Sequence, residues 1–593
     1  MCGFAGERAW DRVADVNAVE QMAAKLGRRG PDARGSWSCD TVALAHRRLK
    51  VIDLSERGAQ PLIDAPLGIA LVMNGCIYNY RELRAELEGK GYAFFSTSDS
   101  EVISKAYHHW GSACVERFAG MFAFALVERD SGRVVLARDR LGIKPLYLAE
   151  LNGALRFAST LPALLAGGGV DTTLDAVALH HYFSWHAVVP APLTVLKGVR
   201  KLPPATVLVI EPDNTRRMAT YWDPPFARLP EHEGMGEAEW SEAILDALRT
   251  AVKRRMVADV PVGVLLSGGL DSSLIVALLA DAGQRDLATF SIGFDDGAGQ
   301  QGDEFEYSDR IAREFATEHV RWRVGPQQAL DGLDGALEAM SEPMTSHDAL
   351  AFYVLSEQVS RSCKVVQSGQ GADEVFAGYS WYPPMRCADG LGDEVYASEF
   401  LDRDESELAD LLAPRFRTPE ADAPSRRFIA SHFQRPGADT PLDRALRLDT
   451  QIMLVDDPVK RVDNMTMAWG IELRTPFLDH ELVELAAACP PELKLAHGGK
   501  GVLKTAARGV VPDAVIDRPK GYFPVPAISH LEGESLALVS DALTSAAARD
   551  RGLYRPEHVA TLLADPIKSR TPIGSSKLWQ IGLLELWLQH HGL

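Results

Sequence analysis

An apolar run, a glycine-rich turn and a helical pattern follow one another without a spacer in the second half of the chain. Val262–Leu266 is typical of a buried strand, SGGLDSS occupies Ser267–Ser273, and a helix is expected over Ser272–Leu279. Further apolar strands are expected at Ala288–Gly293 and Lys364–Gln367. Strands that alternate with helices in this way predict an α/β domain with a doubly wound parallel sheet.

The first 210 residues instead contain short β-type runs separated by turn residues. Strands are expected at Thr41–Ala45, Ala70–Met73, Met121–Val127 and Arg133–Ala137, and helices at Asn79–Glu88 and Ser100–Trp110. We therefore predict stacked sheets in a first domain over residues 2–211, a polar linker over 212–237, and a second domain over 238–593. Within the second domain, Leu391–Arg427 is acidic and is expected to be an irregular, solvated insertion. Mostly helical structure is expected from about residue 442 onward.

Charge and cysteine content exclude several classes of protein. The net charge of the 593 residues is −19, which argues against nucleic acid as a partner because phosphate neutralisation requires a basic surface. No apolar run is long enough to span a membrane, and the first residues lack the pattern of a secretory signal. The seven cysteines are widely spaced and include no CxxC pair, which indicates a cytoplasmic protein without a zinc site.

Cys2 lies where a core cysteine would not normally occur. The initiator methionine is usually removed before a small second residue, which would leave Cys2 with a free α-amine beside its thiol. Such an amine has a pKa of about 8 and can act as the base that activates the thiol. If only its position is considered, the alternative is that Cys2 is an incidental cysteine without a catalytic role.

Four segments in a fixed order strengthen the catalytic interpretation of Cys2. They are RGPD at Arg29–Asp32, AHRRLKVID at Ala45–Asp53, MNGCIYNYRELR at Met73–Arg84 and STSDSEV at Ser96–Val102. Together with Cys2 they resemble the glutaminase domain of class II glutamine amidotransferases. The resemblance implies an Ntn-type α/β/β/α sandwich in which Cys2 attacks the side-chain amide of glutamine.

The same resemblance assigns the residues around the nucleophile. Asn74 and Gly75 would form the oxyanion hole, and Arg48 would bind the α-carboxylate of glutamine, a bidentate task suited to arginine. The remaining implied glutamine contacts are backbone groups at Val51 and Ile52 and the carboxylate of Asp99, which would meet the α-ammonium. One position departs from the family, because the usual Asn-Gly-Glu is Asn-Gly-Cys here, with Cys76 in place of the acid. That change removes one anionic contact to the substrate.

The glycine-rich segment after residue 266 resembles the pyrophosphate loop of N-type ATP pyrophosphatases, which cleave ATP to AMP and pyrophosphate. Backbone N–H groups at such a turn and the adjoining helix N-terminus favour bound phosphate. A second loop, SGQGADEVFAGY at Ser368–Tyr379, again follows an apolar strand. Asp271 and Asp373 would bind Mg²⁺ through carboxylate oxygen. The implied ATP contacts are Leu265, Ser267, Gly268, Gly269, Asp271, Ser272, Ser273, Ile292, Ser368 and Gly369.

Two further segments extend the resemblance across the whole chain. DDPVKRVDNMTMAWGIELRTPFLDH at Asp456–His480 is similar to an asparagine synthetase signature, and DRPKGYFPVP at Asp517–Pro526 places Lys520 where the family has a lysine over the phosphates. The chain is identified as a member of the asparagine synthetase B-type family. The resemblance implies that ATP and Mg²⁺ activate an acceptor carboxylate as an acyl-adenylate. Ammonia from glutamine then displaces AMP through an internal tunnel, and the relatives imply a homodimer.

The acceptor side differs from asparagine synthetases at two positions. Gln370 stands where their second loop usually carries an acid, and Ser346 stands where their EPxxD segment has aspartate. Neutral residues suit an acceptor whose amine is blocked, and the variant motifs resemble those of N-acetylglutaminylglutamine amidotransferases, which form a neutral osmoprotectant. An asparagine synthetase that uses aspartate, or a non-catalytic interaction protein on the same fold, are the alternatives.

Overall fold

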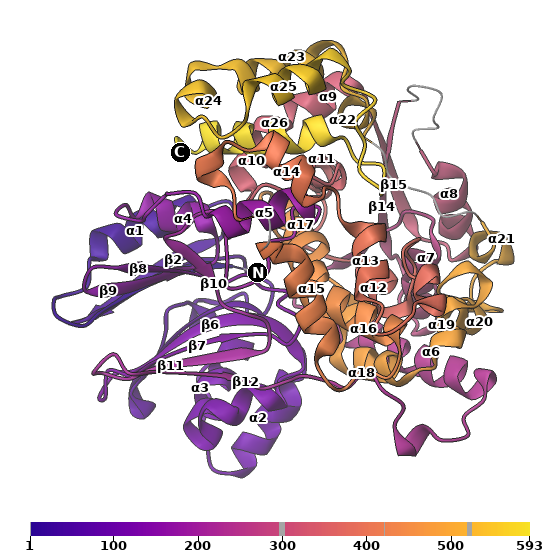
Figure 1. Cartoon of the computed structure of the whole chain (residues 1–593). Coiled ribbons are helices and arrows are strands. Elements are labelled where there is room, and N and C mark those ends of the chain that lie inside the picture. The colour runs from indigo at the N-terminus through magenta and orange to yellow at the C-terminus, as the bar shows by residue number, and fades with distance from the viewer. Residues whose placement is uncertain (1, 296–302, 420–421, 519–524) are drawn as a thin grey trace.

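A computed structural model describes residues 2–295, 303–419, 422–518 and 525–593. Its strands form two six-stranded sheets in the first part of the chain and one five-stranded sheet in the second (Figure 1). In the first part, the strand orders are β10-β8-β9-β1-β3-β2 and β12-β11-β7-β6-β5-β4, and all neighbouring strands are antiparallel.

The two antiparallel sheets lie face to face around one apolar core. Phe4 and Phe157 from the first sheet and Val72 and Leu136 from the second belong to the same buried cluster. The strands of the first sheet are β1 (Gly3–Ala9), β2 (Ala33–Cys39), β3 (Val42–Arg48), β8 (Tyr147–Leu151), β9 (Ala154–Ala158) and β10 (Val199–Lys201). Those of the second are β4 (Leu62–Asp64), β5 (Ile69–Ile77), β6 (Gly120–Glu128), β7 (Val134–Arg138), β11 (Thr206–Ile210) and β12 (Arg216–Thr220).

Helices cover the outer faces of this sandwich. The helices α1 (Val16–Lys25) and α4 (Leu161–Ala166) pack on the first sheet, and α3 (Asp99–Trp110) packs on the second beside α2 (Tyr80–Gly89). The α/β/β/α layering expected from the sequence is therefore confirmed. The segment 212–237, predicted as a linker, contains β12, which extends the second sheet by pairing with β11 from Thr206↔Thr220 to Ile210↔Arg216.

The second part of the chain contains the predicted parallel sheet, in the order β15-β14-β13-β16-β17. The strands are β13 (Val262–Leu265), β14 (Ala288–Phe294), β15 (Glu318–Val324), β16 (Val365–Gln367) and β17 (Glu472–Arg474), and helices between them include α7 (Leu270–Asp281) and α11 (Asp348–Val359). Sheet order reverses at β13, with β14 on one side and β16 on the other. The carboxyl ends of strands at such a switch point form the usual ligand crevice of open α/β sheets.

The prediction of a solvated insertion at 391–427 is wrong. This stretch forms α13 (Asp393–Phe400), α14 (Glu405–Leu411) and the start of α15 (Pro424–Gln434), and it contributes Tyr396 and Phe400 to a buried aromatic cluster. Most of its described acidic residues are exposed or half-buried, with Asp402 the buried exception, so the overall charge of the segment concealed an apolar spacing. In the described ranges, no helix is both long enough and apolar enough to cross a lipid bilayer.

Buried charges join the two parts of the molecule. Asp463 on α17 (Lys460–Met467) accepts Arg29 Nη1 at 2.9 Å and Lys144 Nζ at 3.1 Å, and both partners belong to the first domain. Lys201 of β10 similarly reaches Asp456 Oδ1 at 2.5 Å. All of these side chains are almost completely enclosed, so the interface places the two domains in a defined relation.

Candidate functional site

Cys2 lies immediately before β1. It is 7% exposed, and its backbone N–H donates to Asn74 Oδ1 at 3.2 Å. Burial raises the pKa of the Cys2 thiol above its ordinary value. The Arg29 Nε–H donates to the Cys2 carbonyl at 3.3 Å, so the guanidinium that binds Asp463 also fixes the backbone of Cys2.

Asn74 and Gly75 lie next to Cys2 on β5. Asn74 is fully buried, and its Nδ2 makes no hydrogen bond within the described residues, which leaves an amide donor beside the thiol. Gly75 has φ +152°, and a Cβ there would lie 2.1 Å from the Met121 carbonyl oxygen. Only glycine fits this close approach of β5 and β6. The pair can supply donors to a developing oxyanion, as the resemblance implies.

Arg48 ends β3 and folds over the loop that follows it. Its Nη1 donates to the Ser55 carbonyl at 2.8 Å, and its Nη2 donates to the Ile52 carbonyl at 3.3 Å and to the Asp53 carbonyl. The guanidinium therefore shapes the loop that carries Val51 and Ile52 while it lines the pocket. Among the residues that line the pocket, Arg48 is the cationic side chain that can bind a substrate carboxylate.

Asp99 begins α3 and faces the same pocket. Its Oδ2 accepts the Ile77 N–H at 3.0 Å, yet burial raises the pKa of Asp99 to about 6. Cys76 lies beside it, 1% exposed, and burial raises the pKa of its thiol well above the ordinary value, so this thiol stays protonated. Position 76 therefore contributes no negative charge.

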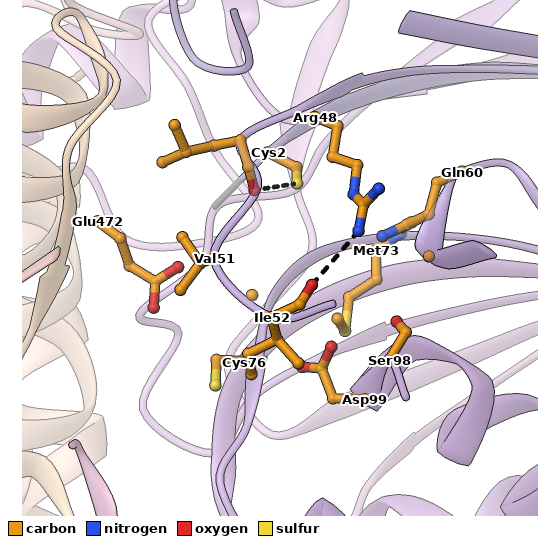
Figure 2. A pocket seen from close by; sticks show the side chains of 13 residues that line it. Cys2, Arg48, Val51, Ile52, Gln60, Met73, Cys76, Ser98, Asp99 and Glu472 are labelled. Atoms are coloured by element: carbon orange, nitrogen blue, oxygen red, sulfur yellow. Dashed lines mark hydrogen bonds between the residues drawn. The ribbon is translucent and has the colours of Figure 1, made fainter. Parts of the chain in front are cut away.

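The predicted residues of the glutamine site, apart from Asn74, converge on one pocket (Figure 2). The predicted residues that line it are Cys2, Arg48, Val51, Ile52, Gly75, Cys76 and Asp99. Sequence reasoning missed the other lining residues, which are Leu49, Gly58, Gln60, Met73, Ser98 and Glu472. Gln60 is positioned by accepting the Met73 N–H at 2.6 Å. Among the lining residues, Glu472 alone comes from the second domain.

The two predicted phosphate loops lie at neighbouring strand ends. The first loop joins β13 to α7, where Gly269 N–H donates to Ser267 Oγ at 3.2 Å and Ser272 Oγ accepts the Ser267 N–H at 3.2 Å. The second loop follows β16. A Cβ at Gly369 would lie 2.8 Å from Asp271 Cβ, so the two loops are in contact.

Lys500 binds both predicted metal ligands. Its Nζ lies 2.7 Å from Asp271 Oδ2 and 3.0 Å from Asp373 Oδ1, and these carboxylates raise the pKa of Lys500 although burial opposes its charge. Sequence reasoning missed this residue, because Lys500 is more than a hundred residues from either loop. Two carboxylates that converge beside a phosphate loop suit Mg²⁺, which is usually held by one or two carboxylates together with substrate phosphates.

The other predicted residues of the second domain have different positions. Leu265 and Ile292 are buried on adjacent strands β13 and β14 at the same sheet edge. Gln370 lies in the second loop, and Ser346 lies in a separate segment before α11; both are half-buried. Lys520 lies outside the described residues. Arg518, two residues earlier, pairs with Glu304 at 2.8 Å and lies over the first loop at Gly269.

Two family models match successive parts of the chain. Residues 1–222 match the family model for a glutamine amidotransferase domain, and residues 243–589 match the model for asparagine synthase. The fold and paired sites thus define a glutamine-dependent amidotransferase of the ATP-dependent carbon–nitrogen ligase class. The chain belongs to the asparagine synthase family.

Named relatives cover nearly the full length. The glutamine-hydrolysing asparagine synthetase 1 of Bacillus subtilis (strain 168) is 31% identical, with 99% of this chain and 96% of the relative covered. Asparagine synthetase 3 of the same organism is 28% identical over 88% and 87% of the two chains. Amidase chyE of Penicillium rubens is 28% identical over 85% and 84%. The relatives therefore include proteins named asparagine synthetase and one named amidase.

Proposed function

We propose that this protein uses ammonia released from glutamine at Cys2 to amidate an acceptor carboxylate that ATP has activated as an acyl-adenylate. Support comes from the pocket that gathers Cys2, Arg48 and Asp99, and from Asn74, whose Oδ1 accepts the Cys2 N–H at 3.2 Å. The side-chain amide of glutamine would lie at Cys2, and its charged end would lie between Arg48 and Asp99. The thiol would form a glutamyl thioester as ammonia leaves.

ATP would bind where the two loops meet. The first loop and the start of α7 would hold phosphate, and Leu265 and Ile292 would border the adenine. Mg²⁺ would be held by Asp271 and Asp373, where it would neutralise charge on the phosphates. Lys500 lies between these carboxylates, so it would shift or share them when the metal binds.

For the acceptor, we propose N-acetylglutaminylglutamine, amidated at its terminal carboxylate. The observation that carries this proposal is the neutral residue Gln370 inside the second loop, next to Gly369 and three residues before Asp373. Free aspartate carries an α-ammonium, which acidic side chains would stabilise. The amine of an acetylated peptide is blocked and carries no charge. Ser346 is the second neutral replacement. Aspartate is the rival acceptor, favoured by the relatives that are named asparagine synthetases.

The test incubates the full-length protein with glutamine, ATP and Mg²⁺ plus either N-acetylglutaminylglutamine or aspartate, and measures AMP and the amide product by mass spectrometry. We expect amide from the acetylated dipeptide; product from aspartate alone would overturn the proposed acceptor. Cys2→Ala should lose the glutamine-dependent reaction and keep the reaction with added ammonium chloride. Loss of both would contradict separate sites.

A matched variant tests the reason given for the acceptor. The double change Ser346→Asp and Gln370→Glu restores the acidic pattern of asparagine synthetases. We expect it to lower amidation of the acetylated dipeptide at least tenfold and to raise any reaction with aspartate. An unchanged ratio between the two acceptors would show that these positions do not select the acceptor.

A further inference from the structure

The wall of the glutamine pocket is completed by the second domain. Glu472, the first residue of β17, lines the pocket and is 1% exposed. Figure 2 shows its carboxylate directed toward the cavity on the same side as Cys76, with Arg48 across the pocket. The pocket that holds Cys2 is thus an interdomain site rather than a cavity of the sandwich alone.

A buried ion pair holds Glu472 in place. Arg474 Nε lies 2.7 Å from Glu472 Oε1, and Arg474 Nη2 lies 3.9 Å from Cys76 Sγ. Arg474 Nη1 also donates to the Arg255 and Val257 carbonyls at 2.7 and 2.8 Å. The Arg474 guanidinium therefore contacts both the Glu472 carboxylate and the Cys76 thiol. Position 76 carries an acid in the glutaminase domains that this chain resembles and a neutral thiol here.

The same region of the second domain also supports the glutamine-binding loop. Asp259 N–H donates to the Val51 carbonyl at 2.8 Å, and Asp259 Oδ2 accepts the Asp53 N–H at 2.8 Å. Contacts from the second domain thus reach both the loop next to Arg48 and the wall next to Cys76. Glu472 is therefore one of several residues of the second domain that support the glutamine pocket.

Charge balance indicates what Glu472 does there. Bound glutamine brings one carboxylate and one ammonium, and Arg48 meets the carboxylate. Asp99 and Glu472 are the carboxylates of the pocket lining, and an ammonium bound between them would be stabilised by both, in addition to the Arg474 that already pairs with Glu472. Burial opposes ionisation of Glu472, but the N-terminal ammonium and then Arg474 lower its pKa, so the carboxylate is charged at neutral pH.

We propose that Glu472 is a glutamine-positioning residue, which supplies from the second domain the negative charge for the α-ammonium that Cys76 does not supply. This proposal rests on the proposed role of Cys2 in the same pocket. Its substrate contact is electrostatic and selects for the amino group of glutamine. It takes no part in bond making at the thiol.

The experiment compares glutamine with glutaramate, the same amide without the α-amino group, in the full-length protein at pH 8. Glutamate or glutarate release is measured without acceptor. We expect Glu472→Gln to raise KM for glutamine at least tenfold, with a much smaller change in kcat, and to leave KM for glutaramate unchanged. An equal rise for both substrates, or no rise, would overturn the proposal.

Three variants separate substrate recognition from folding. Adding Cys76→Glu to Glu472→Gln returns a carboxylate to the pocket and should restore at least half of the lost preference for glutamine; no restoration would count against the proposal. Asp456→Asn removes an interdomain carboxylate that is paired with Lys201 and lies outside the pocket lining, and it should leave the preference unchanged. If Glu472→Gln does not fold, Glu472→Asp keeps the charge but shortens its reach and should raise KM for glutamine alone.

The two proposals fail in different ways. If the unmodified protein releases no glutamate and Cys2→Ala is identical to it, the proposed glutaminase reaction is wrong. If the unmodified protein hydrolyses glutamine and Glu472→Gln matches it, only the role of Glu472 is wrong. The ammonia-dependent reaction of Glu472→Gln serves as the measure of an intact second domain.

Discussion

At the scale of single residues, the glutamine pocket depends on backbone that has no space for a side chain. Gly75 approaches the Met121 carbonyl oxygen so closely that a Cβ would lie 2.1 Å from it and 2.6 Å from Phe122 Cα. The strand β5, which carries the proposed oxyanion donors, can therefore keep its register with β6 only because position 75 is glycine.

Gly75→Ala is expected to reduce glutamine-dependent activity at least 100-fold, because removing or displacing oxyanion donors typically costs 10²–10³ in rate. Ammonia-dependent activity should remain within about twofold, since the second domain is unaffected. Gly89→Ala is the matched control, because Gly89 ends α2 and a Cβ there would meet nothing within 4 Å. Equal activity of the two alanine variants would contradict the prediction.

The raised pKa of Asp99 leads to a prediction of how glutamine use depends on pH. Burial raises the pKa of Asp99 to about 6, so the carboxyl group is neutral below that pH and charged above it. The kcat/KM for glutamine should consequently fall as pH decreases through about 6, while Asp99→Asn should show a low value with no titration in that range. A wild-type midpoint near pH 4 would show that Asp99 is not the group that titrates.

At the scale of elements, the nucleotide site is assembled by loops that leave β13 and β16 and by the residue that precedes α20 (Gly501–Ala507). Asp271 and Asp373 come from the two loops, and Lys500 binds both. One buried cation thus holds two acidic loops together.

Lys500→Met should lower the free energy of unfolding by about 3 kcal/mol without Mg²⁺, because it leaves two carboxylates without their buried cation. Mg²⁺ should raise the Tm of this variant more than that of the unmodified protein. Thermal unfolding with and without the metal measures both effects. Lys504→Met, one turn further along at a more accessible position whose Nζ donates to the His497 carbonyl, should show neither.

The sequence predicted elements whose signal is local and missed contacts between distant segments. Val262–Leu266 and the turn after it could be interpreted correctly because strand, loop and helix are contiguous. Lys500 and Glu472 could not be found in this way, since each acts on residues more than a hundred positions away. The short strand β17 was missed because three residues inside a mostly helical region carry no detectable period.

The neutral residues 76, 346 and 370 illustrate another limit. The resemblance to the family shows that an expected acid is missing from these positions. It does not show whether a side chain from another segment replaces that acid. For Cys76, only the folded chain places a carboxylate nearby, at Glu472. The segment 391–427 was misjudged for the opposite reason, because its surface charge outweighed the spacing of Tyr396, Phe400 and Leu408.

At the scale of the whole molecule, stability and function share the interface between the domains. Asp463 accepts two cations from the first domain, Arg29 and Lys144, and Arg29 in turn holds the carbonyl of Cys2. Removing one partner from buried ionic contacts is costly because the remaining charges lose their compensation.

Asp463→Asn is expected to destabilise the protein by about 3 kcal/mol and to separate the unfolding of the two domains. Differential scanning calorimetry should show one transition for the unmodified chain and two for the variant. Glu481→Gln, at an exposed position of the same domain, should unfold like the unmodified chain. A single transition at unchanged temperature in Asp463→Asn would refute the expected coupling.

The position of Glu472 has a consequence for recombination between relatives. One wall of the glutamine pocket is encoded some 250 residues beyond the end of the sandwich, in the half of the gene that encodes the asparagine synthase domain. A chimera joined within residues 212–237 would therefore inherit its nucleophile from one parent and part of its glutamine pocket from the other. Exchange of acceptor specificity by domain swapping would also alter the use of glutamine unless β17 were exchanged back.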